Sequence, residues 1–402
     1  MTGPPASSIS HIPAGEVPQC GGAARELSMA AEQENRSPVN WRRTVIEGIY
    51  RTGLLRACHG LSRRYEWVDK NGRVGHFRNI REARYVILGY HRVGTERAPL
   101  FSRLPGPVFA RQMQYIRRHY RILSVRQMVE ELRNPGDQGR AVVVTFDDGY
   151  LGTYTEAFPV LEDYQIPATV YLAAGAIEDG KVPWYDRIFL QFRRAGSTLK
   201  LLLDRPRRFE LRSDAARIEA ATEIVMYLRS IPDDERQDWC RRFDRMVPLA
   251  AGDLSGAMMS WEQVRRMQRS GVTFGAHTMT HPVASRLAPE ALRREVAESK
   301  WLIEQRLSSG VDEFAFPFGK PRDCGNTAAT LLAELGFRTA LTTIVGVNRP
   351  GADLFRLRRL VIGDDPSLSM FAFKLHQLFF HPVDEETALI PTADRSSTEG
   401  AA

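Results

Sequence analysis

The sequence has few cysteines, few lysines and no long hydrophobic run. The four cysteines lie far apart, and no Cys-x-x-Cys pair occurs; they are Cys20, Cys58, Cys240 and Cys324. This distribution argues against a disulfide framework or a structural zinc site. No stretch of about 20 apolar residues is available to span a bilayer. Met1–Ala14 has neither the basic nor the apolar region of a signal peptide. These absences predict a soluble, reduced, cytoplasmic protein.

The chain is basic although lysine is scarce. Its 402 residues include 55 Lys and Arg against 48 Asp and Glu, and only six of the basic residues are lysine. The arginines are spread along the chain without an RNA-binding aromatic motif or zinc-finger spacing, so we expect no nucleic-acid partner. A basic surface that meets anionic lipids or glycans stays open. Hydrophobic residues make up 43%, which is typical of a globular protein with a sizeable core.

The two ends differ from the centre. Residues 1–40 are rich in Gly, Pro, Ala, Ser and Glu and predict a disordered arm, with Met29 as an alternative start. Residues 41–82 are expected to be a helical extension, because apolar side chains recur at helical spacing among arginines. This basic amphipathic helix either docks on the main domain or lies on a membrane surface. Residues 366–402 predict an aromatic-rich helix over Ser367–Phe380 and a disordered tail.

Strands and helices alternate in the centre of the chain. The predicted strands are Tyr85–Tyr90, Ala141–Phe146, Ala168–Ala173, Val272–Ala276, Phe314–Phe316 and Phe337–Thr342. The predicted helices are Phe109–Tyr120, Ser124–Leu132, Tyr154–Tyr164, Pro289–Leu307 and Ala328–Leu335. Continuous apolar strands separated by helices indicate a parallel sheet covered on both faces, either a barrel or a doubly wound sheet. The alternation of strands and helices stops over residues 179–253, where helical runs at Ala215–Leu228 and Asp234–Met246 predict an inserted helical subdomain.

Two adjacent carboxylates, Asp147 and Asp148, follow the clearest buried strand. The carboxyl ends of parallel strands form the ligand-binding face of an α/β fold. Since neighbouring side chains point in different directions, one carboxylate can bind a cation while the other contacts water or substrate. The structural alternative is an Asp-Asp-Gly turn that caps the next helix.

A pair of histidines, His277 and His281, follows another predicted strand. His-x-x-x-His spacing can place two imidazoles on one cation, whereas the alternative is a helix start with one exposed histidine. One carboxylate and two histidines leave coordination positions open, as a catalytic divalent site requires.

Two weaker signals lie at other strand ends. The turn in Phe314–Lys320 can expose a backbone N–H to a developing oxyanion, or it simply ends a strand. His91, in Leu88-Gly89-Tyr90-His91, is either a general acid or base or a core residue.

Together, these motifs resemble those of the polysaccharide deacetylases, the NodB-homology family of carbohydrate esterases. Thr145–Gly149 matches the first family motif, and His277-Thr278-x-x-His281 matches the second. The resemblance runs from about Tyr85 to Gly363 and implies a distorted (β/α)7 barrel over residues 83–365, interrupted by the insertion. It also implies metal-dependent removal of N-acetyl groups from sugars. Leu-x-x-His on the first strand is similar to the circularly permuted branch that deacetylates poly-N-acetylglucosamine.

The resemblance implies a role for each motif. The implied metal ligands are Asp148, His277 and His281. Zn²⁺ suits this set, and Co²⁺, Ni²⁺ or Fe²⁺ can bind the same ligands. Asp147 would be the base that takes a proton from the attacking water. His91 would protonate the leaving amine, and the backbone N–H of Phe318 would face the oxyanion.

The sequence departs from the family at the third motif. Ala315 stands where other members carry an arginine that steadies the base. Arg359 is a candidate replacement, and the neighbouring Arg358 fits equally well. Tyr150, Trp184 and Arg359 are candidates for substrate contact, with ordinary packing as the alternative for Trp184.

The expected substrate is an N-acetylated sugar, either a polysaccharide or a lipid- or nucleotide-linked precursor inside the cell. The terminal helices would then suit peripheral contact with the inner membrane face. Two other functions stay open. One is a deformylase or amidase acting on a lipid-linked amino sugar or a small cyclic amide. The other is a non-catalytic glycan-binding scaffold, which Ala315 alone supports. The sugar, the acyl group and the oligomeric state do not follow from the sequence.

Overall fold

The computed structural model describes residue 47 and residues 66–68, 74–76, 83–94, 103–135, 139–254 and 256–380. Within these residues, a parallel sheet of eight strands runs in the order β11-β10-β9-β6-β5-β3-β12, and β4 pairs with β5. The strands are β3 (Arg84–Tyr90), β4 (Arg121–Leu123), β5 (Arg140–Phe146), β6 (Ala168–Leu172), β9 (Thr273–Ala276), β10 (Glu313–Ala315), β11 (Thr339–Leu341) and β12 (Arg359–Val361).

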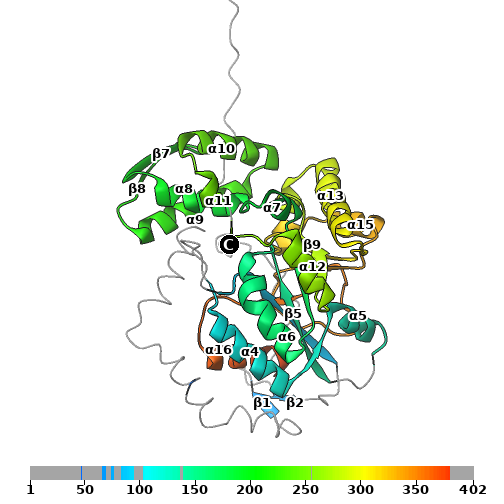
Figure 1. The fold of residues 1–402 in the computed structure, drawn as a ribbon. Coiled ribbons are helices and arrows are strands. Elements are labelled where there is room, and N and C mark those ends of the chain that lie inside the picture. The colour runs from blue at the N-terminus through cyan, green and yellow to red at the C-terminus, as the bar shows by residue number, and fades with distance from the viewer. Residues whose placement is uncertain are drawn as a thin grey trace, which may run out of the picture.

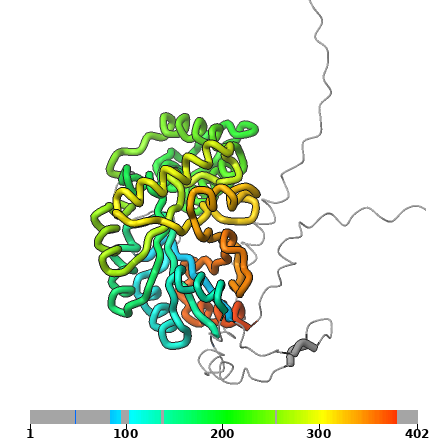
Figure 2. Tube along the Cα trace, turned by 90° about the vertical axis from the view of Figure 1, so that its right-hand side faces the viewer, coloured from blue at the N-terminus to red at the C-terminus, as the bar shows by residue number. Residues whose placement is uncertain are grey.

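The sheet nearly closes into a barrel. A parallel bridge between Leu341 and Leu357 joins the last strand of the path to the segment that leads into β12. Helices surround the strands, and segments from both ends of the described chain lie side by side in the barrel wall (Figures 1 and 2). The expected distorted barrel is therefore confirmed, and the doubly wound alternative is excluded.

After their first residues, Arg84 and Arg140, the strands β3 and β5 are mostly apolar because both of their faces are buried. Alternate residues belong to two different hydrophobic clusters. Val86 and Val142 pack with the surrounding helices, whereas Ile87 and Val143 pack with Tyr171 from β6 in the second cluster. This double burial fixes which strand-end residues emerge at the carboxyl edge of the barrel.

The helices around the barrel are α4 (Gly106–His119), α5 (Val125–Arg133), α6 (Phe158–Tyr164), α7 (Ala174–Asp179), α12 (Trp261–Arg269), α13 (Pro289–Leu307), α14 (Pro321–Cys324) and α15 (Ala328–Glu334). Each helix predicted for the barrel forms close to its expected segment, whereas α7, α12 and α14 were not predicted. Two short turns, η1 (Thr153–Ala157) and η2 (Ala284–Arg286), complete this layer. Ser124 caps the N-terminus of α5 through a capping box with Gln127. Among the described residues, no helix is both long and apolar enough to cross a membrane.

The segment predicted as a helical insertion also contains a β-hairpin. Its elements are α8 (Trp184–Arg194), β7 (Thr198–Leu202), β8 (Pro206–Glu210), α9 (Asp214–Ser230), α10 (Asp233–Met246) and α11 (Ala251–Leu254). The expectation of helices alone was wrong here, because Leu201 and Phe209 of the antiparallel pair are buried and complete the insertion's own core. Figure 1 shows these elements grouped at one end of the barrel.

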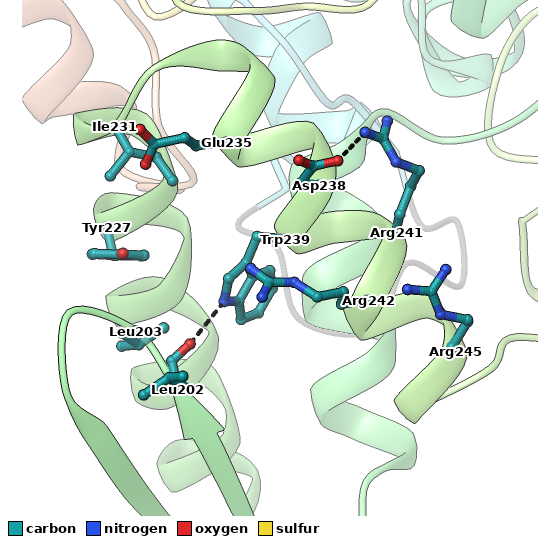
Figure 3. Close-up of a pocket in the computed structure, with 10 residues that line it drawn as sticks. All are labelled: Leu202, Leu203, Tyr227, Ile231, Glu235, Asp238, Trp239, Arg241, Arg242 and Arg245. Carbon is teal, nitrogen blue, oxygen red and sulfur yellow. Dashed lines mark hydrogen bonds and ion pairs between the residues drawn. The ribbon is translucent and has the colours of Figure 1, made fainter. Parts of the chain in front are cut away.

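A surface hollow of about 410 Å³ lies within the insertion. Tyr227 on α9, Ile231 just after it, Leu202 and Leu203 at the hairpin, and Trp239 on α10 form its walls (Figure 3). None of its lining residues belongs to the motifs singled out from the sequence.

The predicted extensions are described in part. Over residues 41–82, Glu47 is helical, but β1 (Glu66–Val68) and β2 (Val74–His76) form an antiparallel pair, which corrects the all-helical expectation. The intervening sequence contains Asn-Gly, a strong hairpin signal. The remainder of that extension, residues 1–40 and the tail after residue 380 lie outside the described residues.

The C-terminal helix α16 (Leu368–Phe380) forms where it was predicted. Its aromatic face packs on the barrel: Phe371 meets Tyr115 edge to face, and Phe379 stacks on Tyr120 at 5.0 Å. These buried rings pack within the protein.

Glu313 gives a stability prediction. Burial raises the pKa of this carboxyl to about 7, with Asp312 adding to the effect. Between about pH 4.5 and 7 the folded state therefore binds more protons than the unfolded chain, and stability falls as pH rises. Glu313→Gln should be near neutral at pH 5 and should stabilise the protein at pH 8 by up to about 3 kcal/mol. Urea unfolding at both pH values measures this, with the exposed Glu334→Gln as the control. An equal effect of Glu313→Gln at both pH values would contradict it.

Candidate metal centre and active site

Three side chains from two strand ends converge at the carboxyl edge of the barrel. Asp148 follows β5, and His277 and His281 follow β9. All three are buried, and one ligand atom from each lies within 4.8 Å of the others. The Asp148 Oδ1 atom is 3.5 Å from Nε2 of His277 and 3.3 Å from Nε2 of His281. Ligands held about 2.0–2.1 Å from a tetrahedral ion are roughly 3.4 Å apart, so this spacing fits a divalent metal.

The hydrogen bonding of His277 prepares its ring for metal binding. Its Nδ1 lies 2.7 Å from the carbonyl oxygen of Ala315, which can only accept. Nδ1 therefore carries a proton, and Nε2 faces Asp148, where the neutral ring would offer its lone pair to a metal. The Asp148 Oδ1 atom is buried without a hydrogen-bond partner in the described part of the chain, as expected of a ligand atom.

Burial and the two imidazoles act against each other on Asp148. Burial favours the neutral acid, but the adjacent His277 and His281 rings hold the pKa of Asp148 well below its usual range. Burial lowers the pKa of His281. Burial acts in the same direction on His277, but Asp148 and Asp147 outweigh burial and raise the pKa of that ring. The set therefore holds one carboxylate and a neutral His281, and a metal would require His277 to be neutral as well.

The backbone around this cluster is strained. Among the described residues, six non-glycine residues have a positive φ, and four of them lie here: Asp148, Thr278, His281 and Phe318. Each such conformation costs about 1–3 kcal/mol unless local contacts offset it. Strain concentrated at strand ends is typical of functional sites.

Asp147 lies beside the cluster between two basic side chains. Its Oδ1 accepts a hydrogen bond from the Arg359 guanidinium at 2.7 Å, and its Oδ2 is 3.6 Å from His91 Nε2. Burial opposes ionisation, but Arg359 and then His277 lower the pKa of Asp147. His91 remains 37% exposed, so it faces solvent rather than the core. A carboxylate and an accessible imidazole thus meet next to the candidate metal ligands.

Arg359 rather than Arg358 occupies the place left by Ala315. The guanidinium of Arg359 is fully buried and also donates to the carbonyl oxygen of Thr342. Arg358 packs against Gly346 instead. The sequence could not separate these neighbours, because the choice depends on the register of β12 against β3.

The turn after β10 presents Phe318 to the site. Its ring lies 4.8 Å from the His281 ring. No hydrogen bond among the described residues uses its backbone N–H, whereas its carbonyl oxygen accepts from Thr343. This free donor suits the oxyanion contact that the resemblance implies.

The three substrate-contact candidates are buried, which favours positioning over contact with a sugar. Arg359 is wholly inside the barrel, and Tyr150 is 1% exposed. The Trp184 indole N–H donates to the carbonyl oxygen of His281, so this ring packs on the metal-binding loop. A cavity of about 320 Å³ lies beside it, between the insertion and His281.

The sequence reasoning missed Tyr185 and Asp186, which follow Trp184, and Arg92, which follows His91. Tyr185 stands 4.8 Å from the His281 ring, and its hydroxyl lies 3.0 Å from that of Tyr150. Asp186 accepts from Tyr150 and from Arg92. Burial raises the pKa of Asp186 to about 6, and Arg92 opposes that shift. No motif signals these contacts, which join residues from 35 to 96 positions apart in the chain.

The sequence pattern described as polysaccharide deacetylase matches residues 134–340. The chain belongs to the polysaccharide deacetylase family. It is therefore a hydrolase of carbon–nitrogen amide bonds, and the family implies an N-acetylated carbohydrate as substrate.

Individual relatives are distant. This chain is 21% identical to the putative polysaccharide deacetylase YxkH of Bacillus subtilis (strain 168) over 295 residues, which cover 72% of this chain and 75% of that protein. It is 34% identical over 87 residues to the poly-beta-1,6-N-acetyl-D-glucosamine N-deacetylase of Escherichia coli (strain K12), covering 21% of this chain and 13% of that protein. The structure of Streptococcus pyogenes deacetylase PplD in complex with acetate superposes with a TM-score of 0.50 at 19% identity, covering 74% and 99% of the two chains. That likeness supports the fold.

The candidate ligands give a metal-binding prediction for this deacetylase. The purified protein should bind one equivalent of Zn²⁺, and His277→Ala or Asp148→Asn should weaken binding at least about 100-fold, because each removes a ligand. Asp147→Asn should keep the metal. Isothermal titration after chelation measures all four proteins. Undiminished affinity in His277→Ala would place the metal elsewhere.

Proposed function

We propose that this enzyme removes N-acetyl groups from amino sugars with a divalent metal held by Asp148, His277 and His281. The observation that carries the proposal is the position of Asp147. Its carboxylate lies between the buried Arg359 and the exposed His91, directly beside the three-ligand cluster. One group suited to accept a proton and one suited to donate a proton therefore face the same reaction space.

The chain's own residues then perform distinct tasks. A bound divalent ion, most simply Zn²⁺, would supply Lewis acidity that activates water and polarises the acyl oxygen. Asp147 accepts the proton of the attacking water, and Arg359 keeps it ionised and oriented. The Phe318 N–H donates to the oxygen on which negative charge develops. Protonated His91 donates to the amine as the carbon–nitrogen bond breaks.

The natural substrate is the finer part of the proposal. We infer an N-acetylated glycan or a lipid- or nucleotide-linked precursor, supported by the family and by the short stretch of identity to the poly-N-acetylglucosamine deacetylase. A formyl or cyclic amide substrate is the second candidate, because the insertion borders His281 and narrows the space around the metal site. Ala315 no longer favours a non-catalytic scaffold, since Arg359 fills the vacated role.

Acetate release from N-acetylglucosamine oligomers tests the function. The zinc-loaded wild type should release acetate, and Asp147→Asn should lose roughly 100- to 10,000-fold in kcat with its metal retained, because the base is gone. His91→Gln should lose turnover in the same range. The exposed Asp312→Asn serves as the matched carboxylate control.

The outcomes separate the alternatives. Formate but no acetate from matched N-formyl and N-acetyl oligomers would favour the deformylase. An Asp147→Asn variant that turns over like the wild type would exclude Asp147 as the base.

A further inference from the structure

One buried carboxylate of the insertion reaches both catalytic strand ends. Asp186, in the first turn of α8, is 1% exposed. Its Oδ2 atom accepts from the Arg92 guanidinium and from the Tyr150 hydroxyl, the latter at 2.9 Å. Arg92 follows His91 directly, and Tyr150 is two residues beyond Asp148. The same carboxylate oxygen therefore connects the segment that bears the proposed acid to the segment that bears the base.

The three partners form a closed unit. The Arg92 guanidinium lies 3.8 Å from the centre of the Tyr150 ring, so it contacts this residue as well as Asp186. Tyr150 is itself fixed by a backbone bridge to Met258, and its neighbour Leu151 donates to the carbonyl oxygen of Ala257. Tyr150 is thus held by the barrel backbone. Asp186, which binds both Tyr150 and Arg92, links Arg92 to this fixed residue.

The His91 ring makes few contacts of its own, so its position depends on its neighbours in the chain. In the described part of the chain, its one polar side-chain contact given by the structure is with Asp147 at 3.6 Å, longer than a hydrogen bond. The ring is partly exposed, whereas the adjacent Arg92 side chain is 8% exposed. The position of His91 therefore depends on the position of the adjacent Arg92, to which it is joined through the backbone.

We propose that Asp186 is a positioning residue for catalysis, which makes the insertion a working part of the active site. This inference rests on the proposed function and adds a component that the family motifs do not contain. Without the Asp186 charge, the buried Arg92 guanidinium loses this ion pair, and the segment that bears His91 loses its link to α8, which allows His91 to move. Displacements of about 1 Å at a reacting group cost on the order of 100-fold in rate.

Asp186→Asn tests this with a matched control. It keeps the side-chain shape, and we expect unchanged zinc binding, KM within about threefold and kcat lowered roughly 10- to 100-fold. Asp233→Asn breaks another buried Asp–Arg pair of the insertion, with Arg236 at 2.7 Å. This control should lower Tm comparably while kcat stays within about twofold. In a His91→Gln background, Asp186→Asn should cost less than about threefold further, because its effect passes through His91.

A readout without turnover keeps the inference separate from the proposed function. The His91 ring resonance in a histidine-labelled sample is identified by its loss in His91→Gln. It should shift in Asp186→Asn and stay in place in Asp233→Asn. If the wild type cleaves no N-acetyl sugar, the proposed function fails and this shift still decides the positioning role.

Two results would overturn the proposal. One is a folded Asp186→Asn protein with an unmoved His91 resonance, and the other is equal kcat losses in Asp186→Asn and Asp233→Asn. Should Asp186→Asn not fold, Arg92→Lys takes its place, because it keeps the charge but loses the planar fork. It should shift the same resonance and lower kcat at least about threefold, and an unchanged resonance would again reject the proposal.

Discussion

The barrel and its chemistry both depend on the buried pair between Arg359 and Asp147. Arg359 lies on β12 and Asp147 follows β5, with β3 between them. The guanidinium passes over β3 at Gly89, where a Cβ would stand 3.6 Å from its terminal nitrogen. A small residue is needed there, since a longer side chain would occupy the path of the arginine. Either charge alone would be buried in the core without a partner, which is energetically costly. Asp147 therefore stays ionised only because the strand order places Arg359 of β12 close to it.

The site gathers features that a fold normally avoids. Asp148, His281 and Phe318 hold positive φ angles, and buried polar atoms of Asp148 and His281 have no partner in the described residues. Each feature is costly alone, and the apolar strands that flank the site supply the rigidity that maintains it. A metal ion would use these atoms as ligands or orient them. The strain and the unpaired atoms are then consequences of one requirement, a pre-formed set of ligands at the strand ends.

Local patterns predicted the barrel strands and the motif positions well. Pro289–Leu307 is helical over the predicted range, and the carboxylates and histidines emerge at strand ends as expected. Pairings between distant residues were beyond such reasoning. The choice of Arg359 over Arg358 follows from register, and Asp186 reaches Arg92 only after the insertion folds against the barrel. The β7–β8 hairpin was missed because its strands are charged on one face and belong to a small separate core.

The family pattern covers residues 134–340, so it contains Asp147 and the candidate metal ligands but neither His91 nor Arg359. Those two neighbours of Asp147 come from the strand before the matched region and from the strand after it. They meet because β5, β3 and β12 are adjacent in the sheet, although 268 positions separate His91 from Arg359 in the chain. Adjacency in the barrel, rather than order in the sequence, is therefore what completes the site. The insertion also reaches the site through such contacts, since Asp186 on α8 binds Arg92 after β3 and Tyr150 after β5.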